Sequence, residues 1–180
     1  MPQLVTIVGN SSSGKTTVIE KLIVELKRKG YRIGAVKHAH HGYDIDQKGK
    51  DSFALKDAGA DIVLVSSPGK IMMIKDDTES ESLDRLESYF QGVDLVIAEG
   101  FKKEPRPKVE VFRSEVHSKP LFQGNKELVA MVSDSDISID VPLFRFHEIR
   151  KLSDFLENKF IKNIDSEDPD SRKQENRWKL

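Results

Sequence analysis

The stretch QLVTIVGNSSSGKTTVIEKLIVEL, residues 3–26, decides the fold. Its first six residues form a short apolar run that is typical of a buried strand and ends at Gly9. Apolar residues at positions 18, 22, 23 and 26 then follow at helical spacing, and Gly30 is a stop signal. Between these two segments lies GNSSSGKTT, which fits the pattern G-x-x-x-x-G-K-[ST]. We therefore predict a strand, a phosphate-binding loop and a helix in direct succession.

The residues of this loop have the chemistry that a nucleotide needs. Gly9 and Gly14 allow a tight turn in which successive amide N–H groups converge on phosphate oxygens, at the positive end of the following helix. Lys15 would neutralise charge on the terminal phosphates, and the Thr16 hydroxyl would ligate Mg²⁺. The predicted nucleotide-binding residues of the loop are Gly9, Asn10, Ser11, Ser12, Ser13, Gly14, Lys15, Thr16 and Thr17.

A P-loop protein also needs an acidic residue near the metal, at the carboxyl end of a second buried strand. The segment DLVIAEGFK, residues 94–102, supplies Glu99 at that end, and Gly100 leaves room for phosphate beside it. Asp94 opens the same strand and would lie at the opposite end of the sheet. We expect Lys15 and Glu99 to be the catalytic groups, and Thr16 and Glu99 to serve the metal. An exposed carboxylate at a strand end is the alternative for Glu99.

The rest of the chain alternates strand and helix patterns, which favours a mostly parallel sheet with helices on both faces. We predict a three-layer α/β P-loop fold over residues 1–162 as one nucleotide-binding domain. A hairpin is expected at residues 61–76, across the turn at Pro68–Gly69. Residues 163–180 are polar and are predicted to be a flexible tail, in which Trp178 could dock on a partner.

Composition excludes several classes of protein. The formal net charge of -1 gives no global attraction to nucleic acid or to an anionic membrane. The chain has no cysteine, which rules out disulfides, thiolate metal sites and a thiol nucleophile. The first ten residues have neither a basic leader nor a membrane span, so we expect a cytoplasmic protein that binds neither nucleic acid nor membrane.

The sequence does not choose between GTP and ATP. The guanine-reading pattern Asn-Lys-x-Asp is nearly present at residues 125–128, but Leu128 stands in place of the aspartate. Asp134 follows a late strand and could accept hydrogen bonds from guanine, although a simple turn aspartate is at least as good an interpretation.

The stretch VKHAHHGYDID, residues 36–46, holds three histidines and two aspartates. A transition-metal site would require several of these side chains to fold back together, because neighbouring side chains at a strand end point in different directions. A solvated loop is a second interpretation. We favour a third, a loop that faces an anionic ligand or a partner's substrate, with Asp44 or Asp46 assisting Mg²⁺. The residues predicted to face the ligand or partner are Lys37, His38, His40, His41, Asp44 and Lys102.

These motifs together resemble the molybdopterin-guanine dinucleotide biosynthesis adaptor family, MobB. The resemblance covers roughly residues 3–160 and rests on GNSSSGKTT, VKHAHHGYDID, KGKDSFALKDAGA, DLVIAEGFK and KVEVFR. It implies a GTP-binding accessory protein for molybdenum-cofactor biosynthesis, with Mg²⁺ as cofactor. It also implies slow hydrolysis, dimer formation, and a MobA-type guanylyltransferase that joins GMP to molybdopterin as the partner. A small-molecule P-loop kinase and a metallochaperone GTPase are the alternatives.

Two further expectations concern turnover and assembly. We find no glutamine or arginine that can be argued to orient an attacking water, so hydrolysis of GTP to GDP and phosphate should be slow. We predict that the segments KIMMIKD, residues 70–76, and KVEVFR, residues 108–113, are edge strands, and they are apolar enough to need covering. With the resemblance, they suggest a homodimer formed through sheet edges.

Overall fold

The computed structural model describes residues 2–39, 46–76 and 82–163, and its contacts divide the chain into two compact units. The main unit combines residues 1–38 with residues 83–180, and the hairpin unit is residues 39–82. The sequence did not predict this division within the expected domain 1–162. Residues 164–180 of the expected tail, with Trp178, lie outside the described residues, as do His40, His41 and Asp44.

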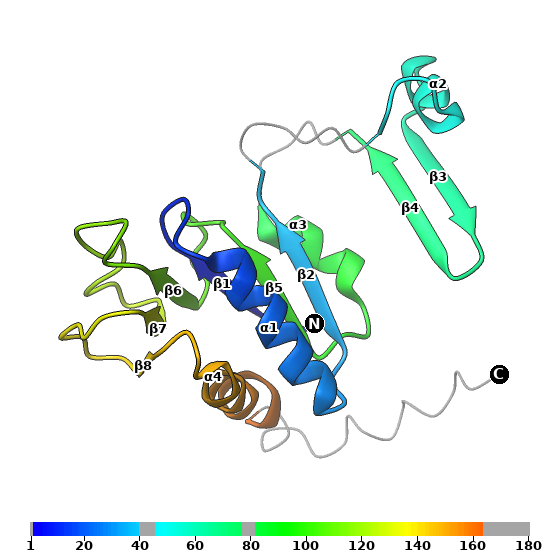
Figure 1. Ribbon diagram of the computed structural model, residues 1–180. Coiled ribbons are helices and arrows are strands. Elements are labelled where there is room, and N and C mark those ends of the chain that lie inside the picture. The colour runs from blue at the N-terminus through cyan, green and yellow to red at the C-terminus, as the bar shows by residue number, and fades with distance from the viewer. Residues whose placement is uncertain (1, 40–45, 77–81, 164–180) are drawn as a thin grey trace. The chain divides into compact units, whose positions relative to one another are not determined.

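The main unit is built on a six-stranded sheet in the order β2-β5-β1-β6-β7-β8, in which every neighbouring pair is parallel (Figure 1). Its strands are β1 (Gln3–Val8), β2 (Ile33–Lys37), β5 (Leu95–Glu99), β6 (Lys108–Phe112), β7 (Leu128–Ser133) and β8 (Leu143–Phe144). Because the strands are parallel, all their carboxyl ends meet at one edge of the sheet, where α/β proteins bind ligands.

Helices cover both faces of this sheet, so the predicted three-layer α/β fold is confirmed. The helical segments are α1 (Lys15–Arg28), α3 (Leu83–Leu86), η1 (Glu87–Phe90), α4 (Ile149–Leu156) and the π-helical η2 (Glu157–Lys162). One face packs on α1 and α4, and the other packs on α3. None of the helices in the described part of the chain is long and apolar enough to cross a membrane.

Strand alternation sorts the buried side chains between the two faces. On β5, Leu95 and Ile97 join the core beneath α1 and α4, whereas Val96 and Ala98 join the core beneath α3. On β1, Val5 and Ile7 likewise face α1 and α4, and Leu4 lies on the other face. Val109 of β6 and Val132 of β7 also face α1 and α4. If this alternation continues past the end of a strand, it also predicts which of the next residues faces the start of α1.

The expectation that KVEVFR is an edge strand is wrong. β6 lies between β1 and β7, and all five of its residues are buried. Its two charged side chains are paired in the interior. Lys108 donates to the carbonyl oxygens of Glu104 (2.5 Å) and Arg106 (3.1 Å) and to the Glu127 carboxylate. The Glu110 carboxylate accepts from the backbone N–H groups of residues 121 (2.6 Å) and 122 (2.9 Å). Pairing, rather than exposure, accommodates these charges.

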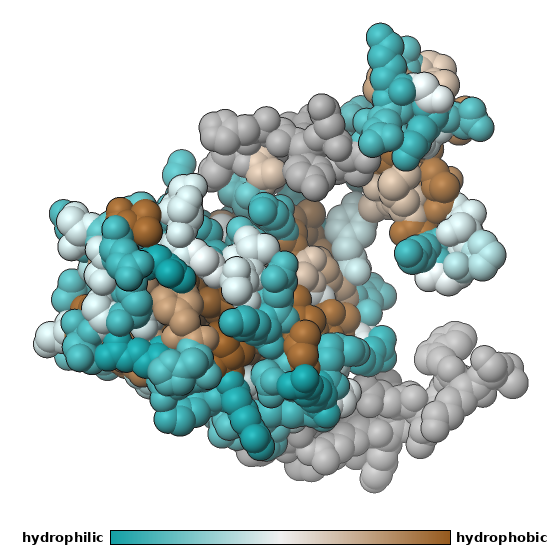
Figure 2. Space-filling view, viewed as in Figure 1, coloured by the Kyte–Doolittle hydropathy of each residue, from teal (hydrophilic) through white to brown (hydrophobic). Residues whose placement is uncertain are grey.

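The hairpin unit contains the predicted hairpin. It consists of α2 (Asp51–Asp57), β3 (Ile62–Ser67) and β4 (Lys70–Lys75), and β3 pairs with β4 in antiparallel register. In the described part of this unit, Val63 is the only buried hydrophobic side chain, and hydrophobic side chains gather on the surface of the hairpin (Figure 2).

Candidate functional site

The loop between β1 and α1 has the backbone shape of a phosphate-binding loop. Gly9 has φ 144°, and a Cβ there would lie 2.3 Å from the carbonyl oxygen of Val111, so only glycine fits. Ser12 adopts φ 61°, a left-handed conformation that few non-glycine residues accept. The Ser13 hydroxyl is buried and has no hydrogen-bond partner within the described chain. A buried hydroxyl inside this loop is a donor suited to a phosphate oxygen.

Lys15 folds back over the loop, and its Nζ donates to the carbonyl oxygen of Asn10 at 2.6 Å. Partial burial lowers the pKa of Lys15 below that of an ordinary lysine. The carboxylate of Glu99 opposes this shift, whereas the ammonium groups of Lys102 and Lys37 reinforce it. Several positive charges therefore gather around one carboxylate, in a place where the negative charge of a phosphate would relieve their repulsion.

Thr16 and Glu99 meet as the sequence predicted for a metal pair. Glu99 continues the row of Leu95 and Ile97, which faces α1, so its carboxylate reaches the first turn of that helix. The Thr16 hydroxyl lies 3.2 and 3.3 Å from the two carboxylate oxygens. A hydroxyl and a carboxylate side by side are hard oxygen ligands that suit Mg²⁺, which commonly keeps several waters. The residues present thus fit the expected metal.

Lys37 and His38, which the sequence placed in one ligand-facing group, lie on opposite faces of the sheet. The Nζ of Lys37 lies 3.6 Å from Glu99, on the α1 side. The His38 ring instead stacks on Phe101, with the ring centroids 4.8 Å apart. Phe101 has φ 50° and belongs to the core beneath α3. Lys37 therefore lies beside Glu99, whereas His38 packs on the core beneath α3.

Three residues that the sequence did not predict also reach the loop. The Nη2 of Arg113 and the ring of Phe146 each come within 3.5 Å of the position that a Cβ on Gly14 would take. The Arg113 guanidinium lies over the Phe146 ring, 4.5 Å from its centroid. The Nε2 of His117 lies 2.8 Å from the carbonyl oxygen of Ser11. Because that oxygen accepts, Nε2 is the donor, and His117 braces the loop.

A sequence signal for Arg113 and Phe146 did exist. Arg113 lies two residues beyond Val111, and Phe146 lies two residues beyond Phe144. Val111 and Phe144 belong to the core beneath α1 and α4. Extending the α1-facing row of each strand past its end would have found both residues, as it finds Glu99.

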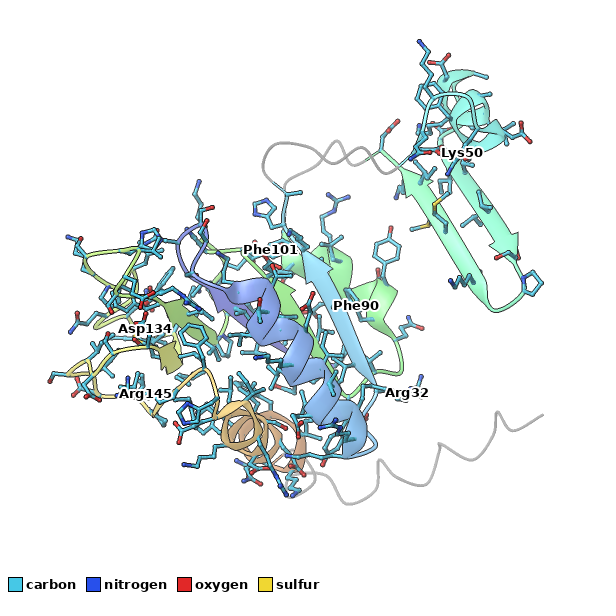
Figure 3. The ribbon with its side chains drawn as sticks, viewed as in Figure 1. Arg32, Lys50, Phe90, Phe101, Asp134 and Arg145 are labelled. Atoms are coloured by element: carbon cyan, nitrogen blue, oxygen red, sulfur yellow. The ribbon has the colours of Figure 1, made fainter. Side chains whose placement is uncertain are left out.

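Asp134 lies on the loop directly after β7, and Arg145 lies directly after β8 (Figure 3). Its Oδ1 accepts hydrogen bonds from the backbone N–H (2.9 Å) and the hydroxyl (3.0 Å) of Ser114. Desolvation acts to raise the pKa of Asp134, but these bonds and the charge of Arg113 together lower it. Asp134 is thus ionised and oriented at the carboxyl edge of the sheet. Its role in reading guanine stays a prediction.

Of the histidine stretch that was interpreted as a possible metal site, His40, His41 and Asp44 lie outside the described residues. Asp46 is described and accepts from the Ser52 hydroxyl at 3.0 Å, within the hairpin unit. Across residues 2–39, 46–76 and 82–163, no group of three or more His, Asp or Glu side chains could hold a metal ion.

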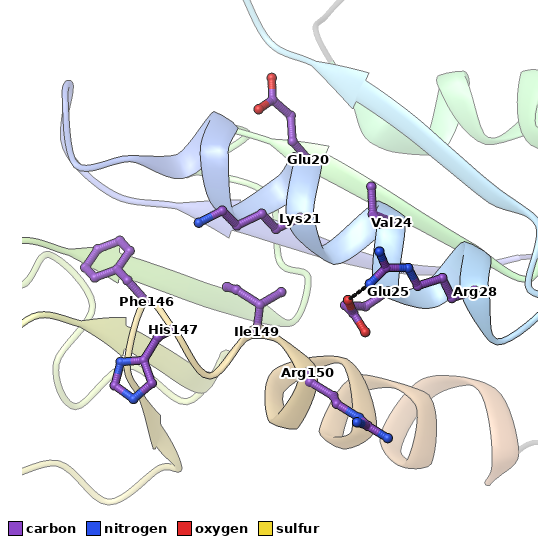
Figure 4. A pocket seen from close by; sticks show the side chains of 9 residues that line it. All are labelled: Glu20, Lys21, Val24, Glu25, Arg28, Phe146, His147, Ile149 and Arg150. Carbon is purple, nitrogen blue, oxygen red and sulfur yellow. Dashed lines mark hydrogen bonds and ion pairs between the residues drawn. The ribbon is translucent and has the colours of Figure 1, made fainter.

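A shallow groove of about 440 Å³ lies between α1 and the segment that leads into α4 (Figure 4). Phe146 and His147 lie at one end of it, and Arg28, paired with Glu25, lies at the other. Its remaining lining residues are Glu20, Lys21, Val24, Ile149 and Arg150. Phe146 therefore stands between this groove and the phosphate-binding loop.

Comparisons with known proteins agree with this geometry. Residues 4–134 match the family model described as MobB, molybdopterin guanine dinucleotide synthesis protein B. The molybdopterin-guanine dinucleotide biosynthesis adapter protein of Haemophilus influenzae is 38% identical over 157 residues, which are 86% of this chain and 88% of that protein. The corresponding adapter protein of Escherichia coli is 34% identical over 153 residues, which are 81% of this chain and 86% of its own.

Solved structures give the same fold. The crystal structure of Bacillus subtilis MobB has a TM-score of 0.69 and 27% identity, and the match covers 88% of this chain and 98% of that one. A crystal structure of molybdopterin-guanine biosynthesis protein B also has a TM-score of 0.69, with 29% identity over 87% of this chain and 99% of that one.

Proposed function

The chain belongs to the MobB family and has an adapter role in molybdopterin-guanine dinucleotide biosynthesis, and we propose that it performs this role by binding GTP with Mg²⁺. The observation that carries the proposal is the meeting of Thr16 and Glu99 at the start of α1, beside the charge cluster of Lys15 and Lys37. In this assignment the loop amides and Lys15 hold the phosphates. Thr16 and Glu99 would hold the metal through its oxygen shell, and the metal would neutralise phosphate charge.

The partner in this proposal is a MobA-type guanylyltransferase, which attaches GMP to molybdopterin in the cytoplasm. The adapter would present GTP, or a surface next to it, to that enzyme. The family match favours neither the small-molecule kinase nor the metallochaperone GTPase. Hydrolysis by the adapter alone should stay below about 1 s⁻¹, because we can assign no group that orients the attacking water.

The deciding experiment is a reconstituted assay of molybdopterin guanylylation with the partner enzyme. Wild-type adapter should stimulate product formation, and Lys15→Ala should lose that stimulation together with GTP binding. Lys21→Ala is the matched control, because Lys21 lies on the same helix and lines the groove outside the phosphate-binding loop. Stimulation by Lys15→Ala equal to that of wild type would remove the P-loop from the adapter role.

The histidine stretch can be tested in the same assay. Replacing His38, His40 and His41 by alanine should lower GTP affinity only modestly, since the loop amides and Lys15 carry the phosphate contacts. Stimulation of the partner should fall much further if this stretch faces the partner's substrate. Full stimulation by the triple variant at saturating GTP would assign the stretch to a solvated loop, and stoichiometric Zn²⁺ or Ni²⁺ in purified wild type would instead favour a metal site.

We also propose that the adapter is a homodimer. β4 remains a candidate for the contact, because its Ile71 side chain is 76% exposed and Met73 is 40% exposed. An exposed apolar strand is a template for pairing with another chain. Light scattering should give a mass of twice 20.4 kDa. A constant mass of one chain over a broad concentration range would contradict this proposal.

A further inference from the structure

The nucleotide site has two ends, and the sheet order tells them apart. Glu99 ends β5 and Lys37 ends β2, and both strands lie on one side of β1. Arg113 follows β6 on the other side of β1. The metal and the terminal phosphates belong beside Thr16 and Glu99. The remainder of a nucleotide that is held by the loop must therefore extend toward β6, β7 and β8.

The side chains at this second end differ from those at the first. Arg113 and Phe146 are half-buried and stacked on each other, and both lie against Gly14. The carboxylate of Asp136 pairs with Arg145, and Asp134 is held by Ser114. A flat cation on an aromatic ring is a surface on which any base can stack, and ionised carboxylates are acceptors for the N–H groups of a purine edge.

From this arrangement we propose that Arg113 and Phe146 form the platform on which the purine base of the bound nucleotide stacks. The proposal deepens the proposed function and rests on it, because it names the base-binding end of the GTP site. The charge of Arg113 would also suit a phosphate ligand. Its ring contact and its electrostatic interaction with Asp134 both hold it on the base side.

Two ligands separate base binding from phosphate binding: GTP and inorganic triphosphate, each titrated by calorimetry with Mg²⁺. Phe146→Ala should weaken GTP binding by roughly 5- to 150-fold, the range for the loss of one base–aromatic stack, and should leave triphosphate binding unchanged. Phe146→Leu keeps apolar packing against the core and should shift affinity in the same direction. Arg113→Lys keeps the charge and loses the flat surface, so it should weaken GTP binding alone.

The matched control is Phe155→Leu, since Phe155 is another partly buried ring of the same core and packs against Phe144 at 5.8 Å between centroids. It should leave the affinities for both ligands unchanged. Equal loss of GTP and triphosphate binding in Phe146→Leu, or unchanged GTP binding in both Phe146 variants, would overturn the platform. Loss of triphosphate binding in Arg113→Lys would make Arg113 a phosphate ligand and overturn its half of the proposal. Absence of GTP binding by wild type would instead overturn the proposed function itself.

Discussion

The two sheets of this molecule are made of similarly apolar strands, and they differ in what covers them. In the main unit, Leu95 and Val96 of β5 are fully buried on opposite faces. In the hairpin unit, the Leu64 side chain of β3 is 62% exposed and that of Ile71 on β4 is 76% exposed. Apolar, β-branched sequence thus predicts where a strand forms, whereas the burial of that strand depends on the layers around it. A two-stranded hairpin that buries little apolar surface of its own is at best marginally stable.

The largest expected effect is a cavity in the main unit. Leu22 on α1 is fully buried between the sheet and α4. Leu22→Ala should lower the free energy of unfolding by about 2–5 kcal/mol, because removed methyl groups lose their contacts and leave a cavity. Leu64→Ala is the matched control in the hairpin unit and should change it by less than about 0.5 kcal/mol. Denaturant titration measures both, and equal losses would contradict the contrast between the two sheets.

Nucleotide binding should stabilise the main unit and leave the hairpin unit unchanged. At a GTP–Mg²⁺ concentration of 100 times Kd, linkage raises the free energy of unfolding of the bound unit by about 2.7 kcal/mol. Hydrogen exchange should therefore slow in β1 and β5, which lead into the site, and stay unchanged in β3 and β4. Lys15→Ala should abolish the protection and Lys21→Ala should retain it. Protection spread equally over the hairpin would show that the two units respond together.

Lowering the pH should reduce the stability of the main unit before that of the hairpin unit. Hydrogen bonds from Lys162, Lys29 and Tyr31 lower the pKa of Glu157 from 4.5 to about 2. Because the folded-state pKa is depressed, this contribution is present above pH 4.5 and is lost as the pH falls toward 2. Glu157→Gln should cost on the order of 1–2 kcal/mol at pH 7.

The cost of Glu157→Gln should vanish near pH 2, which thermal unfolding at several pH values can measure. The control is Asp76→Asn in the hairpin unit. Asp76 pairs with Lys56 at 2.6 Å, but its side chain is 72% exposed, and such pairs contribute little. A difference between wild type and Glu157→Gln that persists at pH 2 would show that the variant acts through packing rather than charge.

The smallest effect on stability is expected at Ile71. Ile71→Ser should change the free energy of unfolding of the single chain by less than about 0.5 kcal/mol, because the side chain is already exposed. If the proposed homodimer uses β4, the same variant should weaken the dimer, and light scattering would show a mass that falls on dilution at concentrations where wild type does not dissociate. A dimer unaffected by Ile71→Ser would direct the search to a different surface.

Much of the fold could be predicted, because the signals were local. The loop from Gly9 to Thr16, the buried strand before Glu99 and the turn at Pro68–Gly69 each have chemistry that few other structures satisfy. The position of β6 could not be read in this way. A strand with Lys108 and Glu110 on one face looks amphipathic, and its burial depends on partners such as Glu127, which the order of strands brings to it.

The candidate site likewise contains residues that the sequence predicted and residues that it did not. Thr16 and Glu99 were predicted together because a P-loop requires a carboxylate at a strand end, and the structure brings them within 3.3 Å. Arg113 and Phe146 were missed because no motif marks them. Extending the α1-facing rows of β6 and β8 past the strand ends points to both residues, and the sheet order then shows that these ends lie beside the loop.

The burial of Lys108 gives the protein a built-in chemical reporter. Its side chain is fully buried, and its ammonium group has three hydrogen-bond acceptors, one for each N–H. An amine-acylating reagent should therefore modify exposed lysines such as Lys102 at once and leave Lys108 untouched in the folded main unit. Delayed acylation of Lys108, followed by peptide mass spectrometry, would record each opening of the strand between β1 and β7. The rate of Lys108 acylation would therefore measure how often the main unit opens, without any introduced label.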